Sequence, residues 1–317
     1  MPAVRRALAL ATVFAPGVLG GLYPHLSKAN HTCSLVEPVL SCSAGAQPGL
    51  TDTCCTETFG GLVLQTQFWS TYTGLEKQGQ LLPKDTWTIH GLWPGSYTQY
   101  CDLKRQYDPF PDPNTTTGTP AGTPVKPWKG RPISDFIKHF KKFDLLAYMN
   151  KFWIAQAQPN WEFWAHEFSK HATCYSTFDT ECYGPEYVQH EEIVDFYSTV
   201  VSYYQQLPTW RWLAEAGIEP SNKTGYSISR IEDVLTGKFG KLPHVGCAGP
   251  KYNETAAGKG STDAGLTVLS ELWYYHHVNG RVQRVQGVPV NSTYPSNCAK
   301  TLGAVWYYER TAHSVAY

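Results

Sequence analysis

Alternating apolar positions, or runs rich in β-branched and aromatic residues, predict short strands along the chain. The predicted strands cover residues 61–67, 86–92, 264–278 and 304–308. Within the second strand, Trp87, Ile89 and Gly91 are expected to face one side of the sheet. Thr88 and His90 are expected to face the other side.

Apolar residues at helical spacing predict five helices, at residues 133–143, 145–152, 162–171, 191–207 and 228–239. A chain of 317 residues with 42% hydrophobic and 14% aromatic residues can bury one substantial core. The expected fold class is therefore α+β, a single domain with a central, mostly antiparallel sheet flanked by helices and stapled by disulfides. Residues 108–128, rich in Pro, Thr and Gly, predict a surface loop within this domain.

The first residues predict a secretory signal peptide. Arg5 and Arg6 precede an apolar run, residues 7–14, which is too short to span a membrane. We expect the signal to occupy residues 1–20 and the mature domain residues 21–317. An uncleaved signal anchor is the alternative.

Cysteines and glycosylation sequons indicate the same compartment. The chain has nine cysteines and no C-x-x-C pair, and adjacent cysteines, Cys54 and Cys55, favour two divergent disulfides over shared zinc ligation. Secreted chains carry glycans on N-x-Ser/Thr sequons, which occur here at Asn30, Asn114, Asn222, Asn253 and Asn291.

Net charge argues against broad adhesion to polyanions. The whole chain has 26 basic and 26 acidic residues, and removing Arg5 and Arg6 with the signal leaves a net charge of −2. A nucleic-acid ligand would therefore be held by local cations and by aromatic faces on which bases stack.

The densest cluster of polar chemistry lies in residues 163–174. Between His166 and His171 the segment holds two imidazoles, the Glu167 carboxylate and the Lys170 ammonium. In a helix Glu167 and His171 share a face, and His166 forms a second pair with Lys170 beside it. A solvated charged helix face is the alternative. Against it, aromatic residues at the spacing of a buried stripe would anchor the helix in the core: Trp161, Phe163, Trp164 and Phe168.

A second histidine motif lies upstream, in Trp87-Thr88-Ile89-His90-Gly91-Leu92-Trp93-Pro94. A single histidine at a strand end is more often structural than catalytic. Two histidine motifs, each flanked by tryptophan, favour a catalytic pair.

Together these motifs resemble the two active-site segments of the secreted ribonuclease T2 family. The resemblance extends from Cys33 through Thr53-Cys54-Cys55 and Leu62-Val63-Leu64-Gln65 to Cys247 and Cys298, and the fungal members are the most similar. It implies an endoribonuclease that cleaves single-stranded RNA through 2′,3′-cyclic phosphates without a metal or cofactor. It also implies no action on DNA, no membrane association, a monomer, and secretion or delivery to a vacuole.

The resemblance implies a role for each candidate residue. His171 would be the general base on the 2′-hydroxyl and His90 the general acid for the leaving oxygen. Glu167 and Lys170 would stabilise the transition state, and His166 would hold the phosphate. The implied base-binding residues are Trp93 and Tyr97 for the first base, and Gln67 and Phe163 for the second. Core packing is the alternative for Trp93.

The resemblance also implies four disulfides, pairing Cys33 with Cys55, Cys54 with Cys182, Cys101 with Cys174, and Cys247 with Cys298. Cys42 is left over because the family usually carries a short Asp- and Cys-containing segment after the Trp-Pro pair, whereas this chain passes directly from Pro94 to Gly95-Ser96-Tyr97. The missing Asp normally helps to read the first base, so we expect low base specificity. Ala172 replaces the family's usual glycine.

Two other function classes fit parts of the pattern. A zinc hydrolase is suggested by His166, Glu167 and His171, but five residues advance a helix by about 500°, so the two imidazoles are expected to diverge. A secreted binding glycoprotein on the same scaffold would lack His90 or His171, and both are present.

Overall fold

The structure is a computed structural model that describes residues 33–95, 101, 131–185, 187–253 and 263–316. Several predicted features lie outside the described residues. These are the signal peptide, the loop 108–128, Tyr97, and the sequons Asn30 and Asn114.

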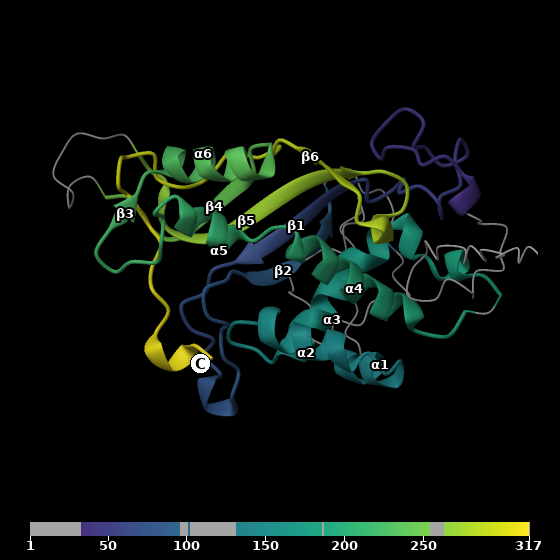
Figure 1. Cartoon of the computed structure of the whole chain (residues 1–317), viewed down its shortest axis with the longest axis horizontal. Coiled ribbons are helices and arrows are strands. Elements are labelled where there is room, and N and C mark those ends of the chain that lie inside the picture. Colours follow the sequence, from purple (N-terminus) through teal and green to yellow (C-terminus); the bar gives the residue numbers. More distant parts are fainter. Residues whose placement is uncertain (1–32, 96–100, 102–130, 186, 254–262, 317) are drawn as a thin grey trace, which may run out of the picture.

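The described strands form one seven-stranded sheet with the order β2-β1-β5-β7-β3, and β4 and β6 also pair with β5 (Figure 1). The strand pairs are antiparallel except for β5 with β7, so the predicted mostly antiparallel sheet is confirmed. The strands are β1 (Leu62–Phe68), β2 (Thr88–Pro94), β3 (Gly225–Tyr226), β4 (His244–Lys251), β5 (Leu266–Val278), β6 (Gly287–Val290) and β7 (Val305–Trp306).

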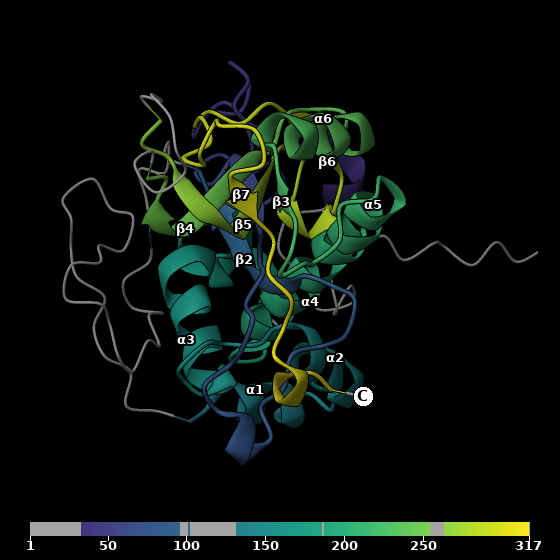
Figure 2. The same ribbon diagram turned by 90° about the vertical axis from the view of Figure 1, so that its left-hand side faces the viewer.

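Helices lie on two sides of this sheet. In Figures 1 and 2, α1 to α4 lie together beside β1 and β2, and α6 lies across the opposite side of the sheet. The helices are α1 (Ile133–His139), α2 (Phe143–Phe152), α3 (Asn160–His171), α4 (Glu191–Gln205), α5 (Thr209–Glu215) and α6 (Ile228–Phe239).

Two apolar clusters fill the core. One joins α1 to α4 to the strands through Val63, Ile89 and Leu92. The other packs α5 and α6 against β5, with Leu272 and Tyr274 fully buried. The five predicted helices are all present, and the predicted α+β class is confirmed.

The elements that the sequence pattern missed are α5, β3, β4 and β6. The β4 strand contains Gly246, Gly249 and Pro250, which are depleted in strands, and it joins the sheet by pairing with the long β5 strand.

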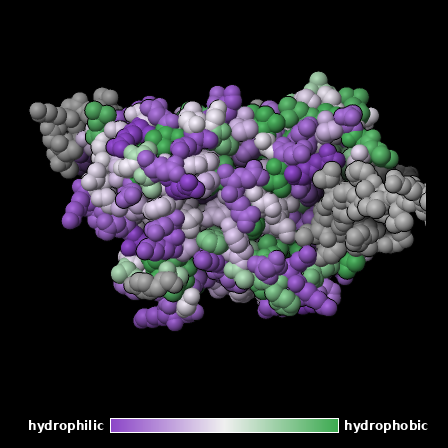
Figure 3. All heavy atoms as spheres, viewed as in Figure 1, coloured by the Kyte–Doolittle hydropathy of each residue, from purple (hydrophilic) through white to green (hydrophobic). Residues whose placement is uncertain are grey.

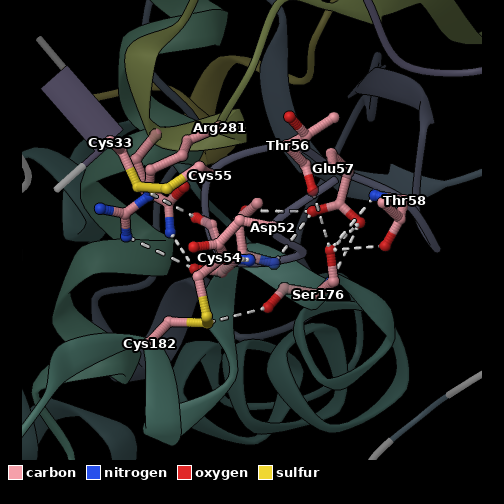
Figure 4. The surroundings of a disulfide bond; sticks show 12 residues. Cys33, Asp52, Cys54, Cys55, Thr56, Glu57, Thr58, Ser176, Cys182 and Arg281 are labelled. Atoms are coloured by element: carbon pink, nitrogen blue, oxygen red, sulfur yellow. Dashed lines mark hydrogen bonds between the residues drawn. A yellow bond between two sulfur atoms is a disulfide. The ribbon is translucent and has the colours of Figure 1, made fainter. Parts of the chain in front are cut away.

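Four disulfides are present, and they are the four pairs implied by the family resemblance. Adjacent cysteines, Cys54 and Cys55, point to different partners: Cys55 holds Cys33, and Cys54 holds Cys182 after the end of α3 (Figure 4). The N-terminal segment is thereby tied to the connection between α3 and α4.

A buried carboxylate reinforces this junction. Glu57 is fully buried, and its Oε1 accepts hydrogen bonds from the backbone N–H groups of Gly60 (2.8 Å) and Ser176 (3.0 Å). Its Oε2 accepts from the backbone N–H and the hydroxyl of Thr177, at 3.1 and 3.0 Å. Burial raises the pKa of Glu57, and these donors lower it. Such a bonded carboxylate fixes the chain just after α3.

Three of the predicted glycosylation sequons lie on the described surface. The sequon residues Asn222, Asn253 and Asn291 are all exposed. On the face seen in Figure 3, hydrophilic and hydrophobic residues are interspersed. Within the described ranges, no helix has the length and apolar character needed to cross a membrane.

Cys42 is exposed and has no disulfide partner. Because the other eight cysteines are paired, thiol titration of the denatured, unreduced protein is expected to find one free thiol per chain. A Cys42→Ser control should reduce that value to zero. Finding Cys42 bonded to Cys101 or Cys174 would contradict the disulfide map.

Candidate active site

His90 lies at a β-bulge. The pairing of β1 with β2 passes from Thr66 opposite Gly91 to Gln67 opposite Ile89, which leaves His90 as the extra residue of β2. The Thr66 hydroxyl stabilises this irregularity, because it accepts a hydrogen bond from Gly91 N (3.0 Å). A bulge redirects the side chains around it, so the simple alternation predicted for β2 is wrong at this point.

The His90 imidazole is held on two sides. Its ring stacks on Phe68 with centroids 3.7 Å apart, and its Nδ1 lies 2.6 Å from Glu271 Oε1 on β5. A carboxylate accepts the Nδ1 proton and thereby leaves Nε2 for the site. Burial lowers the pKa of His90, and the bond to Glu271 raises it.

Helix α3 supplies the other candidate residues. Its apolar side is anchored as predicted, with Phe163, Trp164 and Phe168 buried, and Trp164 Nε1 donates to the carbonyl of Trp153 (3.0 Å). The polar side carries Glu167 toward β2.

Glu167 is the centre of the site. It is fully buried, and its carboxylate lies 3.5 Å from His90 Nε2 and 3.8 Å from His171 Nε2. Trp93 Nε1 donates a 2.9 Å hydrogen bond to Glu167 Oε2. One buried carboxylate therefore contacts both candidate histidines and the candidate base-binding tryptophan.

Gly91 permits this close approach of α3 to β2. A Cβ atom at position 91 would overlap the Glu167 carboxylate and would lie 2.8 Å from Trp93 Nε1. Because of the bulge, His90 and the Cβ position of Gly91 both face Glu167 although they are consecutive in sequence.

Trp93 lies between the two candidate histidines. Its ring stacks on His171 with centroids 5.0 Å apart and meets His90 edge-on at 4.4 Å. The ring is only half-buried and contacts polar site residues, which favours a site role over pure core packing. Burial holds the pKa of His171 well below its usual value, and nearby Lys170 lowers it further.

The expectation that His166 and His171 diverge is wrong. His166, Glu167 and His171 each offer one atom that could bind a metal, and these three atoms lie within 4.8 Å of one another. The physical reason is that His171 ends α3 with φ −117°, ψ −48°, so ideal helical spacing does not apply to it. Helix geometry therefore gives no argument against a metal here.

Ala172 and Lys170, on either side of His171, both bear on the site. Ala172 has right-handed helical backbone angles, φ −60° and ψ −38°, so this position accepts a Cβ in place of the family's glycine. The positive charge of Lys170 lies near enough to lower the pKa of both His90 and His171.

The candidate residues for the second base are placed differently. Phe163 is buried with its ring centroid 5.6 Å from that of His90. The Gln67 amide instead donates to Gln65 Oε1 (3.0 Å) and the Leu207 carbonyl (3.1 Å) in the interior. The structure thus brings Phe163 to the site and does not bring Gln67 there.

Sequence reasoning missed Glu271, Phe68 and Trp273. A carboxylate within the predicted apolar strand 264–278 was the available signal for Glu271. The sequence does not show that Glu271 contacts His90. That contact depends on the pairing of β1 with β5, which places Glu271 opposite Phe68.

Comparison with known proteins agrees with this constellation. Residues 60–279 match the model of the Ribonuclease T2 family. The chain belongs to the ribonuclease T2 family. It is 33% identical over 273 residues to Ribonuclease Le2 of Lentinula edodes, an alignment that covers 84% of this chain and 93% of that protein. The chain is thus an enzyme of the ribonuclease T2 type.

Other ribonuclease T2 relatives are longer than the shared region. The alignment to Ribonuclease T2-like 1-A of Candida albicans has 32% identity and covers 84% of this chain but 57% of that protein. The crystal structure of Actibind, described as a T2 ribonuclease, superposes with a TM-score of 0.63 at 31% identity. The superposition covers 87% of this chain and 97% of the Actibind chain.

Replacing Glu271 by Gln is expected to lower the pKa of His90, because the carboxylate stabilises the imidazolium through its hydrogen bond and its charge. NMR titration of the histidine ring protons measures this shift. The pKa of His190 serves as the internal control, since neither Glu271 nor His90 is among the groups that shift it. An unchanged or higher His90 pKa would contradict the assigned contact.

Proposed function

We propose that this protein is a secreted endoribonuclease that cleaves single-stranded RNA by transphosphorylation, without a metal. The observation that carries the proposal is the pair of imidazoles on one buried carboxylate, with His90 Nε2 3.5 Å and His171 Nε2 3.8 Å from Glu167. General acid–base cleavage at the 2′-hydroxyl needs two such groups on opposite sides of one phosphate.

In the first step His171 takes the proton of the 2′-hydroxyl. The 2′-oxygen then forms a bond to phosphorus, the bond from phosphorus to the 5′-oxygen breaks, and His90 donates its proton to that leaving oxygen. In the second step the roles reverse, and water opens the 2′,3′-cyclic phosphate to a 3′-phosphate.

The electrostatic environments support this division of roles. The groups that shift the pKa of His171 all lower it, which favours the neutral form that a general base needs. His90 alone has the Glu271 hydrogen bond that stabilises its protonated form, as a general acid needs. Both pKa values lie below the usual value, so maximal activity is expected on the acid side of about pH 6.5.

The remaining site residues would act on charge and on the bases. Lys170 and His166 would stabilise the negative charge that develops on the phosphate, and Glu167 would orient both imidazoles. Trp93 would stack the first base and Phe163 would contact the second. Base specificity would be low because the Asp of the family's segment after the Trp-Pro pair is missing.

The proposal includes a cellular setting. A signal peptide at residues 1–20, a mature domain from residue 21, four disulfides and exposed sequons are together consistent with secretion or delivery to a vacuole. The protein would act as a monomer on RNA and would leave DNA intact, because DNA lacks the 2′-hydroxyl.

Product analysis tests the reaction. Mass spectrometry of a digested RNA oligonucleotide is expected to show 2′,3′-cyclic phosphate ends, with no cleavage of the matching DNA and no loss of activity in EDTA.

The His90→Phe and His171→Phe variants should each lose about 10²-fold or more in rate while folding normally, since proton transfer contributes about that much.

Three results would contradict the mechanism. These are 5′-phosphate products, inhibition by EDTA, or more than a few per cent of activity in either histidine variant. RNA binding without cleavage by the unaltered protein would instead support a binding glycoprotein on the same scaffold.

Gly91→Ala is expected to reduce kcat/KM by about 100-fold, because the added Cβ displaces Glu167, and a misplacement of about 1 Å in a catalytic group has that effect. Gly237→Ala is the matched control, since nothing lies within 4 Å of a Cβ there. Steady-state kinetics with circular dichroism as a folding check measures both. Equal activity of the two variants would show that the close approach at Gly91 is not needed.

A further inference from the structure

A row of aromatic rings leads away from the candidate active site. The edge of Trp273 meets Trp93, with centroids 5.5 Å apart and planes inclined by 63°. Beyond it, the His244 ring lies against Trp273 at 4.3 Å, and Tyr294 stands nearly perpendicular to Trp273 at 6.4 Å. We call Trp93, Trp273, His244 and Tyr294 the aromatic row.

Strand pairing puts the three strand residues of this row on one face of the sheet: Trp93 pairs with Leu64, which pairs with Tyr275, two residues after Trp273. Trp273 on β5 lies opposite His244 on β4 and opposite Thr66 on β1. Leu272 and Tyr274, its neighbours in β5, face the other side and are buried under α5 and α6. The apolar cluster that includes Trp93 and Trp273 contains strand residues only, so among the described residues no helix belongs to it.

His244 is buried, but the other three residues of the row are more exposed than core residues. Tyr294 is 52% exposed, and Trp93 and Trp273 are half-buried, whereas Trp87 and Tyr274 within the core are fully buried. Trp273 Nε1 has no hydrogen-bond partner in the described part of the structure, although buried tryptophan N–H groups usually find one.

The loop that carries Tyr294 is held in place. The carbonyl oxygen of Tyr294 accepts a 2.7 Å hydrogen bond from the Ser292 hydroxyl and lies 3.4 Å from His244 Nδ1. A ring presented on such a fixed backbone loses little conformational freedom when a planar ligand stacks on it.

We propose that the aromatic row forms a further nucleotide subsite, in which Trp273 and Tyr294 hold the base on the 5′ side of the nucleotide bound at Trp93. This rests on the proposed function, in which Trp93 stacks the base of the nucleotide that bears the attacking 2′-hydroxyl. The row starts at Trp93 and leads to Trp273, whereas Phe163 lies against His90. The row therefore extends the strand upstream of the cleavage point.

Stacking is also the chemistry this surface needs. A chain with a net charge near zero cannot hold RNA by broad attraction to phosphates. Aromatic faces supply affinity that tolerates any base, and each stacked base contributes a measurable increment.

Binding of non-cleavable 2′-O-methyl oligonucleotides tests the subsite independently of catalysis. Fluorescence anisotropy would compare a dinucleotide with trinucleotides extended by one residue on the 5′ or the 3′ side. The 5′ extension is expected to lower Kd about tenfold in the unaltered protein and less than about twofold in Tyr294→Ala. The benefit of a 3′ extension should be the same in both proteins.

Control variants separate stacking from general damage. Tyr294→Phe should keep the 5′ benefit, and Tyr72→Ala removes an equally exposed tyrosine, 51% against 52%, that has no contact with the row. An equal 5′ benefit in the unaltered protein and Tyr294→Ala, or no 5′ benefit at all, would overturn the subsite. Dinucleotide cleavage, measured in parallel, fails only if the proposed function is wrong.

Discussion

The site depends on one close approach, in which helix α3 lies against strand β2 where Gly91 has no side chain. That gap admits the Glu167 carboxylate into a fully buried position between Trp93, His90 and His171. A buried charged group needs polar partners: Trp93 Nε1 donates a hydrogen bond to this carboxylate, and the two imidazole Nε2 atoms lie 3.5 and 3.8 Å from it. The Trp93 indole and the two imidazoles therefore stabilise Glu167, and Glu167 in turn orients them.

Two anchoring systems keep α3 at this distance from the sheet. On one side Trp164 and Phe168 are packed in the core between α1, α2 and α4. On the other, the chain after His171 is fixed by Cys174, Cys182 and the hydrogen bonds of Glu57. The geometry of the candidate site is thus set partly by disulfides and hydrogen bonds that lie outside the site itself.

The sequence was sufficient for the elements whose signal is local. The polar cluster of α3 and the existence of the β2 strand were predictable from local patterns, but the bulge at His90 was not, because it appears only in the pairing of β2 with β1. Glu271 and the pairing of Trp273 with His244 were not, because register between distant strands is decided by the whole sheet. The convergence of His166 with His171 was missed since the backbone at the end of α3 leaves helical geometry.

The bulge in β2 has a consequence for how this fold balances stability against activity. His90 occupies the one position of β2 that the pairing with β1 skips, so the hydrogen-bonded ladder would be continuous without it. His90 adds no pair to the ladder between β1 and β2, and the Thr66 hydroxyl accepts the hydrogen bond of Gly91 N at the bulge. The strand thus gives up one step of regular pairing at the position where the imidazole faces Glu167, which is where bulges commonly redirect side chains.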